Sequence, residues 1–516
     1  MASRRDELNA YNFARKRTVA AFLKPLPNGS VDSAPRPLKH AVPGIVMAVV
    51  VLAGFGACGM ISPVAPKGWD TPEAGIIVTD PSATRYVVLK SDTKDKSGKS
   101  VGVLHPVLNL ASAKLLLDPK KTGGDSVKKV KEKFLDDSDI TQGSMVGIPY
   151  APDRMPATKD AGTAKTWALC QQPSGGSDEA SVQQTVFVLD KSDESKVTSP
   201  SKGRLGSTQA LYVQDKTGKP YLVSSNGVAY QLVDGPGGDF DSLIATLFGA
   251  EAKPQTVSDD WLNTLRQAPV PISLPSVDGL AGTSTAPDLP AGHNKVGTLI
   301  EGAQNQKYLV EKDRLIAITD FEASLLKETV GTAYPSGAPE YMKVQQTDIH
   351  PTEGSLYDNA PAVKKAGGKL NWPKQKVTRA NAAPGAGGKD VSCSVYQGDN
   401  GGSRSLWAGK SLPIGKISAS ASSYVSPGSG MLYQEQTGSS ASGFNYLVTD
   451  TGLRYHLPVN NDSGNTAGSA KKEVNQSKAR LGYGEVNAVK VPAVWSQLLP
   501  SGPDLTTDAA KQTQNS

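Results

Sequence analysis

The chain has 516 residues, of which 52 are Gly and 36 are Pro, and only 6% are aromatic. This composition predicts dense turns and few long helices, and the length allows several domains. The net charge of +6 is concentrated in residues 1–40, which carry eight Lys or Arg and three acids, so the rest of the chain is almost neutral. Because no basic stripe with interleaved aromatics is present, we exclude a nucleic-acid partner.

Residues 1–40 form a basic arm that predicts an amphipathic helix. Leu8, Tyr11, Val19 and Phe22 fall on one helical stripe, and the first helix-breaking residue is Pro25. The helix could rest on acidic lipid headgroups, or it could dock on a cytoplasmic partner. The sequence does not separate these two interpretations.

Residues 41–66 contain no charged side chain and predict a transmembrane helix. As a helix, residues 42–64 would extend roughly 35 Å, which is enough to cross a bilayer core of about 30 Å. The basic arm in front of this segment places the N-terminus in the cytoplasm and the bulk of the chain outside. A cleaved signal peptide or a lipid anchor at Cys58 fits less well, because the basic region is long and residues 55–57 do not match a lipid-anchor pattern.

The external region repeats itself. Residues 221–232 resemble residues 446–457, residues 308–318 are a third copy, and Tyr86 begins a degenerate fourth. Each copy predicts a β-hairpin. The first and second copies are separated by almost the same number of residues as the third and fourth, which indicates two similar halves, each with an insert between its hairpins.

Two cysteines follow the same duplication. Cys170 and Cys393 are 223 residues apart, which is the offset between the halves, whereas Cys58 lies in the predicted membrane segment. We therefore predict a disulfide between Cys170 and Cys393 on a pseudo-twofold axis, with Cα atoms about 4.4–6.8 Å apart. The alternative is two unrelated buried thiols.

The predicted fold is mainly β with short helices, consisting of one N-terminal transmembrane helix and four small repeat domains around a duplicated central β domain. The predicted segments are the arm (1–40), the transmembrane helix (41–66), a stalk (67–73), repeat 1 (74–135), the first central segment (136–204), repeat 2 (205–275), repeat 3 (290–345), the second central segment (360–429), repeat 4 (430–500) and a disordered tail (501–516).

Motifs that would carry chemistry are absent from the sequence. Two Gly-Lys-Ser triplets, at 98–100 and 409–411, lack the first glycine of a phosphate-binding loop. The five His are scattered, and there is no Cys-x-x-Cys pair. The sequence therefore predicts no catalytic, cofactor-binding or metal-ligating residue and no cofactor.

Several segments resemble the EccB family of the type VII (ESX) secretion system of actinobacteria, and the resemblance covers residues 1–500. The segments that carry it are the opening 4–17, residues 105–113 and residues 148–153. It implies partners of the EccC type (an FtsK/SpoIIIE-like ATPase) and the EccD type (a membrane channel subunit), in some members an EccE-type subunit, and self-association of the external domains. It also implies that Cys170 and Cys393 correspond to the paired cysteines of the family.

Two classes of function remain open at this point. The first is a structural subunit of a secretion complex in the cell membrane. The second is an extracytoplasmic hydrolase acting on ATP or on cell-wall material, since some family members are labelled ATPases. The second class needs converging acid, base or nucleophile groups, and the sequence offers no such cluster. A module that only binds the cell wall is a third interpretation.

Overall fold

The structure is a computed structural model. It describes residues 3–23, 42–52, 65–94, 100–118, 127–173, 182–289, 292–345, 349–354, 356, 372–382, 387–398, 402–415, 417, 421–438, 443–458 and 476–514. The chain divides into two compact units, Met1–Lys67 and Gly68–Ser516.

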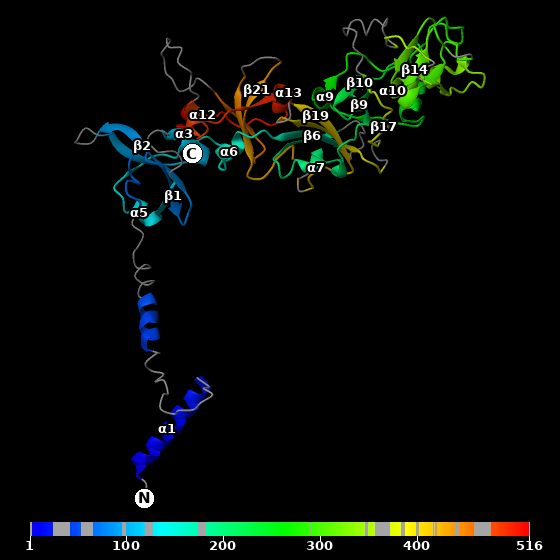
Figure 1. The fold of residues 1–516 in the computed structure, drawn as a ribbon. Helices are drawn as coiled ribbons and strands as arrows, with labels where there is room; N and C mark the ends of the chain where they lie inside the picture. The colour runs from blue at the N-terminus through cyan, green and yellow to red at the C-terminus, as the bar shows by residue number, and fades with distance from the viewer. Residues whose placement is uncertain are drawn as a thin grey trace. The chain divides into compact units, whose positions relative to one another are not determined.

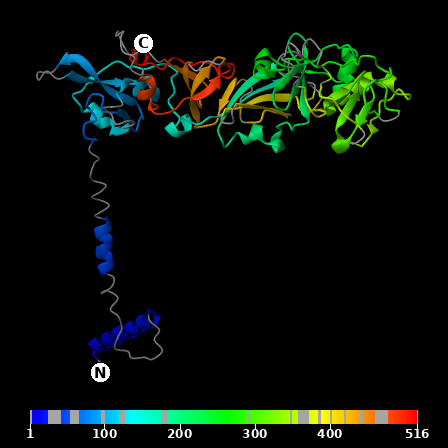
Figure 2. The same cartoon turned by 45° about the horizontal axis from the view of Figure 1, so that its top comes forward.

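The first unit contains the helix that the basic arm predicts. Helix α1 spans Arg4–Leu23, with the acids Asp6 and Glu7 in its first turn (Figures 1 and 2). Before the helix, the Ser3 N–H donates to the Asp6 carboxylate at 3.2 Å. Acids at this end of a helix are favourable because they face unpaired N–H groups and the positive end of the helix dipole.

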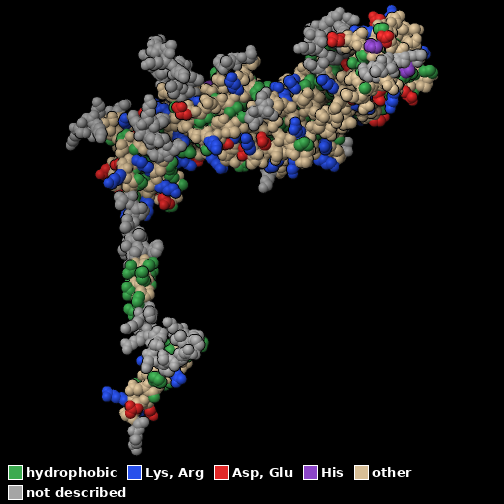
Figure 3. Space-filling model, in the orientation of Figure 1, with side chains coloured by type: hydrophobic (Ala, Val, Ile, Leu, Met, Phe, Trp, Pro, Cys, Tyr) green, Lys and Arg blue, Asp and Glu red, His purple; other side chains and the backbone are tan. Residues whose placement is uncertain are grey.

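Residues 42–52 form a second helical stretch in this unit. Its apolar side chains are exposed, and Figure 3 shows them as a surface without Lys, Arg, Asp or Glu. Within the described residues of the chain, no helix combines the length and the apolar character needed to cross a bilayer. Residues 53–64 of the predicted membrane segment lie outside the described residues.

The second unit is mainly β with short helices, as the sequence predicts. Four of its sheets, which we number 1 to 4 in chain order, share one pattern. Three consecutive strands form an antiparallel meander, and a later strand pairs in parallel with the first of them. The second strand of each meander has a tyrosine as its second residue: Tyr86, Tyr221, Tyr308 and Tyr446.

The strands of these sheets have the following bounds. Sheet 1 contains β1 (Ile76–Asp80), β2 (Arg85–Lys94), β3 (Ser100–Pro106), β4 (Val127–Lys131) and β5 (Thr141–Gln142). Sheet 2 contains β8 (Gln209–Gln214), β9 (Pro220–Ser224), β10 (Val228–Gln231), β11 (Gln255–Thr256), β12 (Arg266–Gln267) and β17 (Thr378–Arg379). Sheet 3 contains β13 (Leu299–Glu301), β14 (Lys307–Val310), β15 (Leu315–Ile318) and β16 (Met342–Lys343). Sheet 4 contains β21 (Gly430–Gln436), β22 (Asn445–Thr449), β23 (Arg454–Leu457) and β24 (Val489–Pro492).

The fifth sheet combines strands from both halves of the chain, and we call it the central sheet. Its order is β19-β18-β6-β7-β20. The bounds are β6 (Thr166–Pro173), β7 (Val182–Leu189), β18 (Val391–Gln397), β19 (Ser403–Gly409) and β20 (Ser423–Val425).

A helix follows the meander in each numbered sheet, and local capping fixes where three of these helices begin. The Asn109, Asp239 and Thr319 side chains each accept a backbone N–H in the first turn of their helix. The helices of the second unit are α3 (Leu110–Leu116), α5 (Glu132–Asp136), α6 (Thr158–Ala161), α7 (Ser195–Thr198), α8 (Phe240–Phe248), α9 (Asp259–Asn263), α10 (Asp320–Thr329), α12 (Gln476–Arg480), α13 (Ala493–Ser496) and α14 (Thr507–Ala510). Short 3₁₀ turns are η2 (Pro200–Lys202), η3 (Ala303–Asn305) and η4 (Gly331–Ala333).

Shared hydrophobic cores determine which sheets are neighbours in the second unit. One core joins the central sheet to sheets 2 and 4 through buried side chains such as Trp167, Trp261 and Trp495. A second joins sheets 1 and 4, and a third joins sheet 2 to helix α10 of sheet 3. The neighbours are therefore sheet 1, sheet 4, the central sheet, sheet 2 and sheet 3 in that order, as Figures 1 and 2 also show.

Two predicted boundaries differ from the structure. Strand β5, which the prediction assigns to the first central segment (136–204), pairs with β3 in sheet 1. Strand β17, which it assigns to the second central segment (360–429), pairs in parallel with β8 in sheet 2. The Asn381 side chain adds two hydrogen bonds to the backbone of Tyr212, each 2.9 Å long. Both differences arise from long-range strand pairing, which leaves no local pattern in the sequence.

The prediction of a disordered tail at 501–516 is wrong. Residues 501–514 are described, and Leu505 and Ala510 are fully buried. The Leu505 N–H donates to the His456 carbonyl at 2.9 Å, and helix α14 packs on helix α3 of sheet 1. The polar composition of this segment hides one apolar turn, which Thr506 caps by accepting the Ala509 N–H at 3.0 Å.

Candidate functional site

The predicted disulfide joins the two halves of the chain at the middle of the central sheet. Cys170 of β6 and Cys393 of β18 lie directly opposite each other and are bonded. Their Cα atoms are 4.0 Å apart, which is closer than the predicted 4.4–6.8 Å. The reason is their position as facing residues on adjacent antiparallel strands, where non-hydrogen-bonded pairs approach to about 4.5 Å. Both cysteines are fully buried.

One face of the central sheet carries an aromatic core shared with sheets 2 and 4. Trp167 contacts Tyr433 edge to face at a ring distance of 5.9 Å, and Tyr396 stacks on Trp495 at 5.6 Å. Trp261 of α9 and Trp495 of α13 are both fully buried, and neither indole N–H has a hydrogen-bond partner among the described residues. These side chains hold the sheets together by burial of apolar area rather than by polar contacts.

Buried polar contacts fix the register between the central sheet and sheet 2. The Gln171 amide donates to the Ser258 hydroxyl, and the Ser258 N–H donates back to the Gln171 carbonyl oxygen at 3.2 Å. The hydroxyl groups of Thr264 and Ser394 lie 2.7 Å apart. Because an unpaired buried polar group is costly, such pairs favour one arrangement of the two sheets.

A buried ion pair fastens sheet 4 to the segment that enters the central sheet. Lys165 is almost fully buried and pairs with Asp160 at the end of helix α6. The same carboxylate accepts the Ser429 hydroxyl and the Gly430 N–H, each at 3.0 Å. Burial raises the pKa of Asp160, but the donors from Lys165, Gly430 and Ser429 outweigh burial and hold the pKa below its ordinary value of 3.8.

This ion pair predicts an acid-sensitive junction. Because the folded state lowers the pKa of Asp160, its contribution is complete above the unfolded pKa and is lost as the pH falls through the folded pKa. We expect Asp160→Asn to destabilise the protein by about 1–3 kcal/mol at neutral pH, since Lys165 is left without its partner. Thermal unfolding between pH 2.5 and 7.5 should show the difference from wild type shrinking below pH about 4.

The matched control for this experiment is Asp259→Asn, because the Asp259 side chain is exposed and lies 4.0 Å from Lys216. This control should melt like wild type at every pH. A difference between wild type and Asp160→Asn that stays constant down to pH 2.5 would refute the role of the Asp160 charge.

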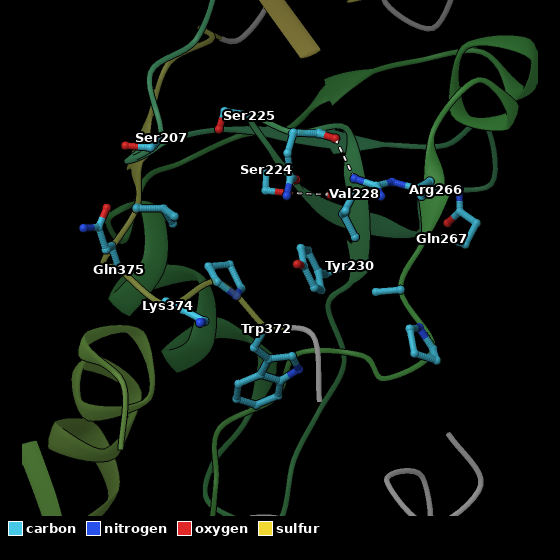
Figure 4. A pocket seen from close by; sticks show the side chains of 15 residues that line it. Ser207, Ser224, Ser225, Val228, Tyr230, Arg266, Gln267, Trp372, Lys374 and Gln375 are labelled. Carbon is cyan, nitrogen blue, oxygen red and sulfur yellow. Dashed lines mark hydrogen bonds between the residues drawn. The ribbon is translucent and has the colours of Figure 1, made fainter. Parts of the chain in front are cut away.

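A pocket of about 820 Å³ lies in sheet 2, between strands β10 and β12 and residues 372–377 (Figure 4). Tyr230 and Trp372 are buried in its walls. The Arg266 guanidinium donates to the Asn226 carbonyl at 3.1 Å, and the Trp372 indole donates to the Pro271 carbonyl at 3.2 Å. No local sequence pattern marks this pocket, because residues 372–377 approach sheet 2 from far along the chain.

The two Gly-Lys-Ser triplets do not lie in a phosphate-binding loop where the structure describes them. Gly409 ends strand β19, and no helix follows in residues 410–415. A phosphate-binding loop instead joins a strand to the N-terminus of a helix. Residues 95–99 of the first triplet's loop lie outside the described residues. Within the described ranges, no group of three or more His, Cys, Asp or Glu could hold a metal ion.

Fold and core together define a multi-sheet protein whose halves meet at a disulfide-bonded central sheet. The family model for "Type VII secretion system ESX-1, transport TM domain B" (EccB) matches residues 1–516. The chain therefore belongs to the EccB family, and it is a core subunit of a type VII secretion system. Comparison with curated proteins gives no match.

Solved structures with a similar fold come from ESX complexes. A chain of an intact ESX-5 inner membrane complex has a TM-score of 0.53 and 19% identity, with 100% of this chain and 96% of that chain covered. A chain of the periplasmic assembly of the ESX-5 inner membrane complex has a TM-score of 0.53 and 18% identity, covering 88% and 98%. The EccB3 dimer from the ESX-3 core complex has a TM-score of 0.55 and 21% identity, covering 85% and 100%.

Proposed function

We propose that this chain scaffolds the external side of a type VII secretion channel as a structural subunit of the membrane complex. The observation that carries the proposal is the family match over the whole chain. The likeness of the fold to chains of ESX-5 and ESX-3 complexes agrees with it. Burial also favours a scaffold, because the side chains that join the halves pack against one another rather than line a cleft.

The proposed topology has the N-terminal arm in the cytoplasm, one crossing within residues 41–66 and the second unit outside. The charge difference across the uncharged segment supports this orientation. An extracytoplasmic location also agrees with the Cys170–Cys393 disulfide, since such bonds persist in oxidising compartments.

Reporter fusions at Lys24 and Gly68 test this topology. We expect activity from a cytoplasmic reporter at Lys24 and from an extracytoplasmic reporter at Gly68, because the uncharged segment separates the two positions. Cytoplasmic activity at Gly68, or a mature protein that lacks residues 1–60, would contradict the single crossing.

We also propose that the second unit arose by duplication and contains four copies of one repeat around a pseudo-twofold axis. Support comes from the strand pattern shared by sheets 1 to 4 and from the tyrosine at the same place in each. In the central sheet, Gln171 faces Ser392 and Leu169 faces Ser394, so the pairing of β6 with β18 is symmetric about Cys170 and Cys393. The predicted domain bounds, shifted for β5, β17 and the tail, follow this division.

The proposed partners are other subunits of the same complex: an EccC-type ATPase, an EccD-type channel subunit and an EccE-type subunit. Self-association of the second unit is proposed because one similar solved structure is a dimer. A strain that lacks this chain tests the function. Secretion of ESX substrates should return with the full chain and should not return with residues 1–67 alone, whereas secretion restored by residues 1–67 would contradict an external scaffold.

A further inference from the structure

The pocket in sheet 2 has an unusual balance of charge. None of the 15 side chains drawn around it in Figure 4 is acidic, whereas Arg266 and Lys374 are both cationic and exposed. Lys374 reaches the pocket from the chain segment that crosses sheet 2, and Arg266 reaches it from strand β12. A volume of about 820 Å³ is in the size range of small-molecule sites.

The positive charge at this place lacks a compensating acid. Among the described residues, no carboxylate lies within ion-pair distance of Arg266, Lys374 or the neighbouring Arg404. The Arg404 guanidinium donates to the Thr264 carbonyl at 3.0 Å. Burial lowers the pKa of Arg404, and the nearby charge of Arg266 lowers it further. Like charges held together in this way would gain from an anion placed between them and the pocket.

The rest of the lining is suited to hydroxyl groups rather than to an oily ligand. Ser207, Ser224, Ser225, Asn226, Gln267 and Gln375 supply hydroxyl and amide groups, which can both donate and accept hydrogen bonds. Tyr230, Trp372 and Val228 add apolar surface between these polar groups. A ligand that satisfies this lining has many hydroxyls, a hydrocarbon face and at least one negative group.

We propose that this pocket binds a sugar that bears a carboxylate or a phosphate group, with its acidic group held by Arg266 and Lys374. Arg266 uses one guanidinium nitrogen for the Asn226 carbonyl, so its remaining N–H groups can donate to the anion. Lys374 supplies a second charge from the opposite side of the pocket. Charge-assisted hydrogen bonds of this kind are about twice as strong as neutral ones. This site is independent of the scaffold function, since either could exist without the other.

Isothermal titration calorimetry on the full chain in lipid nanodiscs tests the proposal. The probes are a uronic-acid tetrasaccharide, a sugar phosphate, a neutral tetrasaccharide and inorganic phosphate. We expect at least one acidic sugar to bind about tenfold more tightly than the neutral sugar and than inorganic phosphate. The two acidic probes distinguish a carboxylate ligand from a phosphate ligand.

Three variants assign the binding to the pocket. Arg266→Gln and Lys374→Gln should each weaken the acidic sugar about tenfold. Lys376→Gln is the matched control, because Lys376 lies two residues away on the same segment, is exposed and does not line the pocket. Melting curves confirm that all three variants are folded. The proposal is overturned if no acidic sugar binds at millimolar concentration, if the neutral sugar or inorganic phosphate binds as tightly, or if Arg266→Gln and Lys374→Gln bind like wild type.

Discussion

Replacing Cys170 with Ser is expected to lower the melting temperature of the second unit by roughly 5 °C or more. The bond closes a loop of 223 residues through the middle of the central sheet. A loop of this length gives an upper value of about 5 kcal/mol in the chain-entropy account of disulfides. The loss should concentrate at the central sheet, because sheets 1 and 3 keep their own cores.

The cysteine variants also have internal controls. Cys393→Ser should melt at the same temperature as Cys170→Ser, and the double variant should add little, because each change removes the same bond. In the denatured, unreduced full chain one thiol, that of Cys58, should react with a thiol reagent, and three should react after reduction. Three reactive thiols before reduction would show that the bond is absent.

Trp495→Ala is expected to destabilise the protein by about 3–5 kcal/mol, because it opens a cavity where sheet 4 meets the central sheet. Trp261→Ala should cost a similar amount at the junction with sheet 2, since Trp261 has the same burial and its indole N–H likewise has no partner among the described residues. Trp495→Phe should cost clearly less, because it keeps an aromatic ring and removes the unpaired donor. Differential scanning calorimetry of the four proteins measures these differences.

Phe444 supplies the matched control for the tryptophan variants, because its ring is 63% exposed although it also lies in sheet 4. Phe444→Ala should melt close to wild type. If Trp495→Ala also melted like wild type, the shared aromatic core would not be what holds sheet 4 to the central sheet.

Local sequence patterns predict the mainly β fold and the cysteine pair. The four tyrosine-centred copies correspond to the second strands of four meanders, because alternating apolar residues and polar turns encode hairpins locally. The offset between Cys170 and Cys393 matches the offset between the halves, so the duplication itself indicates the pairing of β6 with β18. The cap at Asn109 likewise marks the start of α3.

Contacts between distant segments of the chain could not be predicted in this way. Asn381 bonds the backbone of Tyr212 across 169 residues, and Gln171 pairs with Ser258 across 87. Neither contact leaves a periodic signal, because each depends on a single side chain and on the final packing of two sheets. The same limit explains the buried tail and the pocket in sheet 2, where segments far apart in the sequence meet.

Purification of the full chain from the membranes of its own cell, with an affinity tag at the C-terminus, tests its role in the secretion complex most directly. We expect EccC-type and EccD-type subunits to be recovered with it in fixed ratios, and electron microscopy of the particles to show its second unit on the external side. Recovery of the chain alone from gently solubilised membranes, with the other subunits assembled without it, would contradict a core structural role.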